Sequence, residues 1–210
     1  MGRYVGPSCR QCRREGMKLF LKGTKCETAK CQIERRQRSL APGMHGWRKA
    51  RLSEYGVRLR EKQKIKRYYG VYEQQFMRYF HRAERLQGNT GENLLQLLER
   101  RLDNVVYKLN FAASRKAARQ FIGYGHILVN GRKVDVSDYV LKVGDKITIK
   151  NAEKSRKRVK QQLESNPNFT TQTWLQLDRE APAATMVALP TRQDVQIPVE
   201  EQLVVEFCSR

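Results

Sequence analysis

The sequence predicts an α+β fold: a helical N-terminal domain, then a domain of helices packed on an antiparallel sheet. Apolar residues repeat with helical spacing through residues 57–109, whereas short apolar runs bounded by Gly or Pro begin near residue 127. Four cysteines in two close pairs add a metal-pinned segment near the start of the chain. Helices followed by strands are typical of α+β proteins.

The first half of the chain predicts helices. Residues 1–50 predict loops and short helices, because Gly, Cys and basic residues interrupt any period. Helix formers then dominate residues 57–69 and 73–86. One long amphipathic helix is expected from the N-cap candidate Thr90 to residue 109, where Leu and Val recur at helical spacing.

The second half predicts short strands between helices. Ser114 is a candidate N-cap for a short helix that Gly123 ends. Asn130 and Gly131 suit a type I′ turn, because both tolerate positive φ angles, so a β-hairpin is expected around them. The other expected elements are strands at residues 127–129, 146–150, 174–177 and 184–189, a strand containing Val134 and Val136, a charged helix at 153–165, and a closing helix from Pro198.

Positive charge is the dominant global property. The chain has 42 Lys and Arg against 21 Asp and Glu, a net charge of +21 and a pI near 10.1. The excess lies in the first 150 residues, since charges balance over residues 151–210. Such a field attracts polyanions and releases their counterions. Nucleic acid is therefore the expected partner; an anionic membrane or a merely soluble basic surface are the alternatives.

The sequence predicts neither membrane insertion nor export. No run of 18 apolar residues occurs, and the first 25 residues are basic and interrupted by Gly and Pro. The myristoylation pattern fails because Gly6 stands where Ser or Thr is needed. We expect a reducing, cytoplasmic location.

Four of the five cysteines, Cys9, Cys12, Cys26 and Cys31, are spaced as a set of metal ligands. Two close pairs joined by a loop can place four thiolates around one structural Zn²⁺ ion. An iron–sulfur cluster uses the same ligands, and disulfides or free buried thiols are further alternatives. Cys208 lies alone in an apolar run and is interpreted as a small buried hydrophobe.

Basic side chains crowd the predicted helix that follows Ser114. Arg115 and Arg119 are four residues apart, Lys116 lies beside them, and the helix offers no acidic partner. An anionic ligand explains this face, and a solvated basic helix is the alternative. A second cluster, in residues 62–72, interleaves basic residues with Tyr68, Tyr69 and Tyr72, which are interpreted either as stacking platforms for bases or as core residues.

No catalytic motif is present. Neither His-Glu-x-x-His, Gly-x-Ser-x-Gly nor a complete Rossmann or P-loop pattern occurs. The three histidines, His45, His81 and His126, have no partner that the sequence identifies. The protein is therefore predicted not to be an enzyme.

Taken together, these motifs resemble the bacterial-type S-four family of small-subunit ribosomal proteins, in its four-cysteine form. The central segments resemble the small RNA-binding domain named after that family: Arg101-Leu102-Asp103-Asn104-Val105-Val106-Tyr107, Phe111-Ala112-Ala113-Ser114-Arg115, Ala118-Arg119-Gln120, Gly125-His126-Ile127 and Val129-Asn130-Gly131. The flanks resemble the family too, including Tyr4-Val5-Gly6-Pro7, Tyr69-Gly70-Val71-Tyr72-Glu73 and Val205-Glu206-Phe207-Cys208-Ser209-Arg210. Asn110, Tyr124 and Cys208 depart from it, standing where Gly, His and Tyr are usual.

The resemblance implies a structural protein that binds the 5′ domain of small-subunit rRNA, nucleates assembly, and contributes to mRNA entry and translational accuracy beside proteins S-three and S-five. It implies a helical domain at residues 1–93, on which a helix at 197–210 packs, and an α+β domain at 94–196 containing the RNA-binding module at about 100–165. Zn²⁺ on the four cysteines is the only cofactor expected. No small-molecule substrate or membrane partner is expected.

Nineteen side chains are expected to contact RNA. They are Arg3, Arg10, Arg13, Arg14, Lys22, Arg35, Arg36, Arg58, Lys62, Lys64, Lys66, Arg67, Arg115, Lys116, Arg119, His126, Asn130, Arg132 and Lys133. The alternatives from other classes are an RNA-modifying enzyme of the pseudouridine-synthase kind, which needs a catalytic domain that the chain after residue 150 does not provide, and a zinc-dependent DNA-binding regulator.

Overall fold

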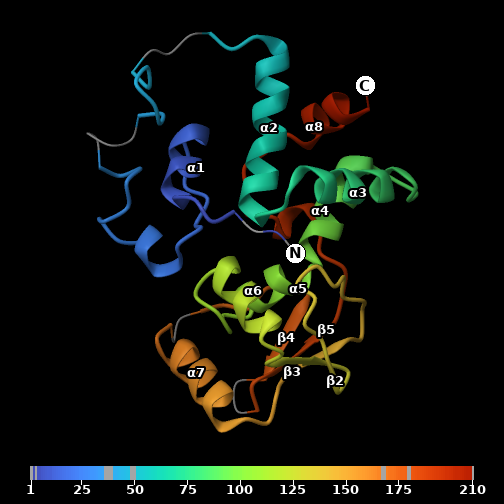
Figure 1. Cartoon of the computed structure of the whole chain (residues 1–210). Coiled ribbons are helices and arrows are strands. Elements are labelled where there is room, and N and C mark those ends of the chain that lie inside the picture. Colours follow the sequence, from blue (N-terminus) through green and yellow to red (C-terminus); the bar gives the residue numbers. More distant parts are fainter. Residues whose placement is uncertain are drawn as a thin grey trace. The chain divides into compact units, whose positions relative to one another are not determined.

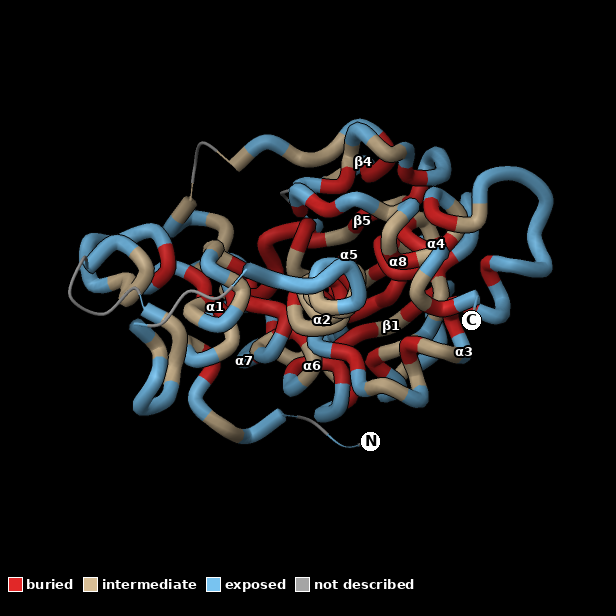
Figure 2. Tube along the Cα trace, turned by 90° about the horizontal axis from the view of Figure 1, so that it is seen from above, coloured by how far each residue is buried: buried red, intermediate tan, exposed pale blue. Residues whose placement is uncertain are grey.

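The chain forms two compact units in the computed structural model, which describes residues 2, 4–35, 40–47, 51–166, 169–178 and 181–209 (Figure 1). The first unit comprises Met1–Leu94 with Gln196–Arg210, and the second comprises Leu95–Val195. Within each unit, buried residues form the interior and most loop residues are exposed (Figure 2). None of the described helices is long and apolar enough to cross a bilayer.

The first unit is helical. Its elements are α1 (Ser8–Glu15), the 3-10 turn η1 (Gly23–Cys26), α2 (Glu54–Tyr69), α3 (Glu73–Glu84), the start of α4 (Thr90–Glu99), and α8 (Glu201–Cys208). Helix α2 begins earlier than the predicted residue 57, because the Ser53 hydroxyl accepts a hydrogen bond from Gly56 N at 3.2 Å and caps it.

Helix α8 packs against α2, although the two lie at distant positions in the sequence. The Tyr55 and Phe207 rings lie 5.3 Å apart between centroids, and Arg58 donates a hydrogen bond to Glu206 at 2.9 Å. Cys208 is buried, and burial raises the pKa of its thiol to about 11. It serves here as a small core residue, as its apolar surroundings indicated.

The start of α8 corrects the sequence prediction. The helix begins at Glu201 rather than at Pro198. Ile197 and Val199 are both buried while Pro198 is exposed, which is the alternation of an extended segment rather than of a helix. The amide of Glu200 donates to Glu61 of α2 at 3.4 Å, so packing on α2 holds this segment extended.

The second unit contains one five-stranded antiparallel sheet. Its strand order is β2-β1-β3-β5-β4, with every neighbouring pair antiparallel. The strands are β1 (Ile127–Val129), β2 (Arg132–Lys133), β3 (Lys146–Ile149), β4 (Leu175–Asp178) and β5 (Ala183–Met186); the helices are the end of α4, α5 (Leu102–Lys108), α6 (Arg115–Gly123), α7 (Glu153–Glu164) and the 3-10 turn η3 (Arg192–Asp194). The predicted antiparallel sheet is thus confirmed, but β2 stops before Val134 and Val136.

The single helix predicted over residues 90–109 is wrong, because the structure has two helices there, α4 and α5. Arg101 between them is extended, with φ −64° and ψ 135°, and bridges Val140. Its guanidinium is fully buried and donates to both oxygens of Asp103, at 3.1 and 2.9 Å. Local apolar spacing does not reveal this break, since its cause is a strand-like contact with residues some forty positions later.

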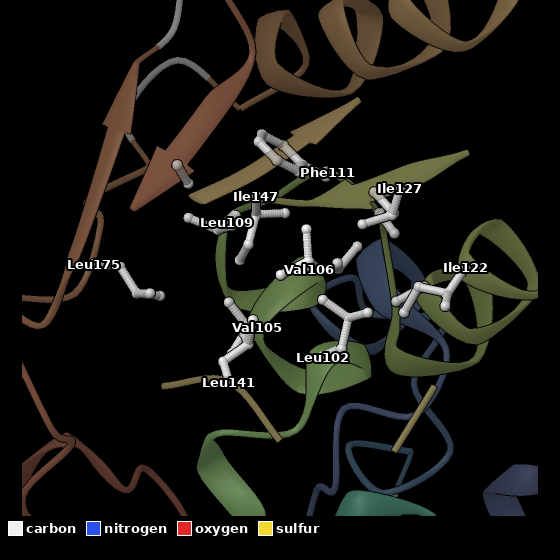
Figure 3. Close-up of a cluster of buried hydrophobic side chains, with 14 of the residues drawn as sticks. Leu102, Val105, Val106, Leu109, Phe111, Ile122, Ile127, Leu141, Ile147 and Leu175 are labelled. Carbon is white, nitrogen blue, oxygen red and sulfur yellow. The ribbon is translucent and has the colours of Figure 1, made fainter. Parts of the chain in front are cut away.

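Helices α5 and α6 and the sheet share one apolar core. Figure 3 shows Val106 of α5 pointing toward Ile127 and Ile147 of the strands, with Val105 beside Leu141. Helix α7 contributes Val159, which is fully buried in the same cluster. Burying each such side chain contributes about 1.5–3 kcal/mol, so this core holds α6 and the hairpin in a fixed arrangement.

The buried carboxylate of Asp103 holds the junction between α5 and α6. Burial alone would raise the pKa of Asp103, but Arg101 and Arg119 together outweigh it and hold that pKa below its usual value. A carboxyl with a depressed pKa stabilises the fold above its unfolded pKa, near 3.9, and that contribution is lost as pH falls toward the folded value.

We predict that Asp103→Asn lowers the free energy of unfolding by about 3–5 kcal/mol, because it leaves the buried Arg101 without its counter-charge. Urea unfolding at pH 7 measures the loss. Repeating it from pH 7 to pH 3 should show a shallower acid dependence in the variant than in the wild type. The exposed Asp135→Asn is the control, with a change within about 0.5 kcal/mol. An equally small change for Asp103→Asn would contradict this role.

Candidate nucleic-acid interface

Two local motifs position a basic surface on the second unit. Ser114 caps α6 as predicted, its hydroxyl accepting from Ala117 N at 3.2 Å. The predicted hairpin turn is also confirmed, with φ of 51° at Asn130 and 78° at Gly131. The Asn130 side chain donates to Asp145 at 2.8 Å and accepts from the Lys146 amide at 2.9 Å. Asn130 therefore fixes the turn that presents β2.

An exposed strip runs along α6 and ends beside β2. Lys116, Gln120 and Tyr124 recur every four residues, and the Gln120 amide donates to the Tyr124 hydroxyl at 2.9 Å. A Cβ on Gly125 would lie 2.1 Å from Cε of Lys133, so the Lys133 chain crosses this glycine directly beside Tyr124. We call the exposed set Lys116, Gln120, Tyr124, Arg132 and Lys133 the module face.

Arg115 and Arg119 make internal contacts. Arg115 is buried, donates to Asn104 at 2.8 Å and lies over the Tyr107 ring at 4.6 Å. Arg119 donates to Asp103 at 2.7 Å. The sequence of α6 offers these arginines no acidic partner, and the interpretation that they lack one is wrong. In the folded chain, α5 supplies Asp103. Their assignment to RNA stays a prediction, and both have a structural role.

His126 is held at the junction of α6, β1 and α7. Its ring lies 4.8 Å from the Phe121 ring and 6.2 Å from the Tyr124 ring, between centroids. Its Nδ1 lies 3.0 Å from the Ser155 hydroxyl of α7. His126 thus supports the exposed Tyr124 ring, which is the module-face group suited to stacking on a base.

The predicted basic set on α2 is engaged within the first unit. Glu73 of α3 accepts from Lys62 at 2.5 Å and from Lys66 at 2.8 Å. Burial would raise the pKa of Glu73, but these two hydrogen bonds keep that pKa below its usual value. Glu15 of α1, whose side chain is fully buried, pairs with Arg67. These contacts join α2 to α1 and α3.

The other predicted side chains of this unit divide into paired and exposed groups. Lys64 pairs with Glu61, and Arg58 pairs with Glu54 and Glu206. Tyr68 and Tyr69 are buried, so they are core residues rather than stacking platforms for bases. Tyr72 is exposed. Arg13 donates to the Leu40 carbonyl at 2.7 Å. The exposed predicted cations are Arg10, Arg14, Lys22 and Arg35, while Arg3 and Arg36 lie outside the described residues.

The four thiols proposed as metal ligands lie in the first unit. Cys9 and Cys12 are on α1, Cys26 ends η1, and Cys31 follows it; all are free. Burial raises the pKa of the Cys12 thiol, and electrostatic repulsion from Cys26, Cys9 and Cys31 raises it further. The Lys22 amide donates to Cys26 Sγ at 3.4 Å, a contact that suits a thiolate. Soft sulfur donors fit Zn²⁺, yet no three candidate ligands converge closely enough to hold a metal among the described residues.

Sequence reasoning missed five exposed cations on α7: Lys154, Arg156, Lys157, Arg158 and Lys160. None of them makes an ion pair with a described side chain, unlike the cations of α2. The signal was present as a run of basic residues at 154–160. It was obscured because acidic residues elsewhere in 151–210 balance the charge of that part of the chain.

Two family models cover most of the chain. Residues 3–99 match the ribosomal protein S4/S9 N-terminal domain, and residues 100–147 match the S4 domain. Curated relatives align over all of this chain and all of their own length. Small ribosomal subunit protein uS4 of Halothermothrix orenii is 55% identical over 210 residues, that of Thermoanaerobacter sp. (strain X514) 54%, and that of Desulforamulus reducens 52%.

This chain belongs to the uS4 family of ribosomal proteins. The family consists of structural proteins of the small ribosomal subunit and not of enzymes, and its S4 domain binds RNA. The module face lies on α6, β2 and the turn after α6, all within the S4-domain match.

Substitutions on the module face should weaken RNA binding without lowering the stability of the fold. Lys116→Gln, Arg132→Gln and Lys133→Gln together should reduce the salt-dependence slope of RNA binding by about 2, because three phosphate contacts disappear. The melting temperature should hardly change, since all three side chains are exposed. Filter binding across a salt series and thermal melting measure the two quantities.

Arg119→Gln is the contrasting variant. It should lower the free energy of unfolding by about 1–3 kcal/mol, because Asp103 loses one of its two cationic donors. An unchanged salt slope in the triple variant would remove the module face from the RNA interface.

Proposed function

We propose that this uS4-family chain binds the 5′ domain of small-subunit rRNA early in assembly, where several RNA helices converge. The observation that carries the proposal is that both compact units align with uS4 relatives over their full length. Exposed cations on both units support it, since each can neutralise phosphates of converging RNA strands.

Recognition of the RNA rests on shape more than on sequence. Side chains cannot read the narrow major groove of an A-form helix, so contacts go to phosphates, 2′-hydroxyls and unstacked bases. The module face offers groups for each: Lys116, Arg132 and Lys133 for phosphates, and Tyr124 for stacking. The apolar core beneath holds these groups in position, which lowers the entropic cost of binding.

The proposal extends to the surroundings of the protein in the subunit. It places the chain in the cytoplasm, near the mRNA entry region, with proteins S-three and S-five as neighbours and a contribution to translational accuracy. The family resemblance supports this part.

The proposal also includes a structural Zn²⁺ held by Cys9, Cys12, Cys26 and Cys31. The C-x2-C spacing and the amide that donates to Cys26 support it. A bound ion would crosslink α1 to η1, two elements that bury few apolar residues of their own. Arg10, Arg13 and Arg14 would offset the negative charge of the thiolates.

Specific RNA binding is tested by competition. The purified chain should keep its complex with the 5′ domain of its own small-subunit rRNA at about 0.2 M salt under an excess of unrelated structured RNA, because charge alone is largely screened there. Gel-shift titration measures the retained complex. Duplex DNA is the second competitor. Equal loss to every competitor would leave only a generic basic binder and reject the proposal.

Metal binding is tested by measuring the metal content of the purified protein and its sensitivity to proteases. The purified chain should contain one zinc per molecule by elemental mass spectrometry, and Cys9→Ser should lose it and make the segment around α1 and η1 protease-sensitive. Cys208→Ala is the matched control, because it removes a cysteine outside the set and should keep the metal. Iron in place of zinc would indicate a cluster. Metal-free protein with a protease-resistant α1 would refute the metal site.

A further inference from the structure

An open groove of about 980 Å³ lies on the second unit beside α7. Its lining among the described residues comes from α7, the end of β3 and the start of the segment that leads into β5. The buried side chains of Ile149 and Pro182 form its apolar part. The groove lies beyond residue 147, outside both segments that match family models.

Three cations of α7 line this groove: Arg156, Lys157 and Lys160. All three are exposed, and none pairs with a carboxylate within the described ranges. The only acidic residues lining the described part of the groove are Glu153 and Glu164, at the two ends of the helix. The positive charge is therefore concentrated at the centre of the groove.

Available ion pairs on α7 are not formed. Glu153 and Lys157 are four residues apart, as are Lys160 and Glu164, which is the spacing that favours pairing on a helix. The structure forms neither pair among its described ion pairs. The cations of α2 and α6, by contrast, mostly contact carboxylates of neighbouring elements.

The groove wall is held in place by the core. Val159 is fully buried in the core cluster, and Ser155 contacts His126 at 3.0 Å. These contacts fix which side of α7 faces outward. Lys154 and Arg158 are also exposed on this helix but do not line the groove.

We propose that this groove binds the sugar-phosphate backbone of a short RNA segment, as a second contact distinct from the module face. Lys160 lies one turn beyond Arg156 and Lys157, and the spacing of about 5–6 Å between positions one turn apart suits successive phosphates. Thr148, Asn151 and Gln161 offer hydrogen-bonding groups for 2′-hydroxyls, and the apolar floor suits ribose. The proposal rests on the RNA-binding function proposed above.

The size of α7 limits the length of the bound segment. Its 12 residues span about 18 Å at ~1.5 Å per residue. At about 5–6 Å between successive phosphates, that distance corresponds to roughly three to four nucleotides. The terminal carboxylates of Glu153 and Glu164 repel phosphates and restrict the strand to the central part.

The test compares two double variants of the full chain with equal charge. Lys157→Gln with Lys160→Gln removes two cations from the groove, whereas Lys154→Gln with Arg158→Gln removes two from the same helix outside it. Gln preserves helix propensity, and thermal melting confirms that both fold. Affinity for the 5′-domain rRNA is measured over a salt series, with hydroxyl-radical footprinting of each complex.

The groove variant should lower the salt-dependence slope by about 1.4–1.8, corresponding to two lost phosphate contacts, and the control by less than about 0.5. In the complex with the groove variant, one stretch of about four nucleotides or fewer should lose its protection from hydroxyl radicals, while the rest of the footprint persists. Equal slopes for the two variants, or an unchanged footprint, would overturn the groove proposal. Loss of wild-type selectivity over unrelated RNA would instead reject the proposed function itself, so the two failures are distinguishable.

Discussion

A chain with 42 basic and 21 acidic side chains must build its interior with few carboxylates. The fold places several of them where helices meet. Glu15 joins α1 to α2, Glu73 joins α3 to α2, and Asp103 joins α5 to α6. Each is held by at least two cations, and the buried carboxylates of Glu15 and Asp103 would cost several kcal/mol if left unpaired. The positions of the carboxylates therefore determine which Lys and Arg side chains form ion pairs within the protein and which can bind an anionic partner.

The second unit shows how such pairing extends into a network. Glu99 accepts from Lys108 at 2.8 Å and from Asn104 at 2.6 Å, and Asn104 in turn accepts from Arg115. Burial lowers the pKa of Lys108, and Glu99 opposes this shift. Satisfied polar groups of this kind fix a single arrangement of helices, because each requires its partner at a defined distance. The exposed strip of α6 thus rests on a polar network as well as on an apolar core.

Many of the other cations in the described part of the chain face solvent, and their mutual repulsion is unfavourable in the free protein. A phosphate backbone supplies the negative charge that the chain lacks. This gives one physical basis for the module face, the exposed arginines of α1 and the groove beside α7. The family models cover the first two of these, and only the groove beside α7 lies outside both matched segments.

The sequence by itself determined the α+β class, the Ser114 cap, the Asn130-Gly131 turn and the uS4 resemblance, because these depend on local backbone preferences, periodicity and motifs. Asn110 likewise takes the left-handed conformation, with φ 56°, that a Gly usually provides in the family. Tertiary structure alone decided that Arg101 breaks a long amphipathic helix and that Ile197 and Val199 delay α8. It also decided that Arg115 and Arg119 bind internal partners, while the α7 cations form no ion pair with any described side chain. Whether a cation is paired depends on which carboxylates folding brings near it, and spacing along the chain does not carry that information.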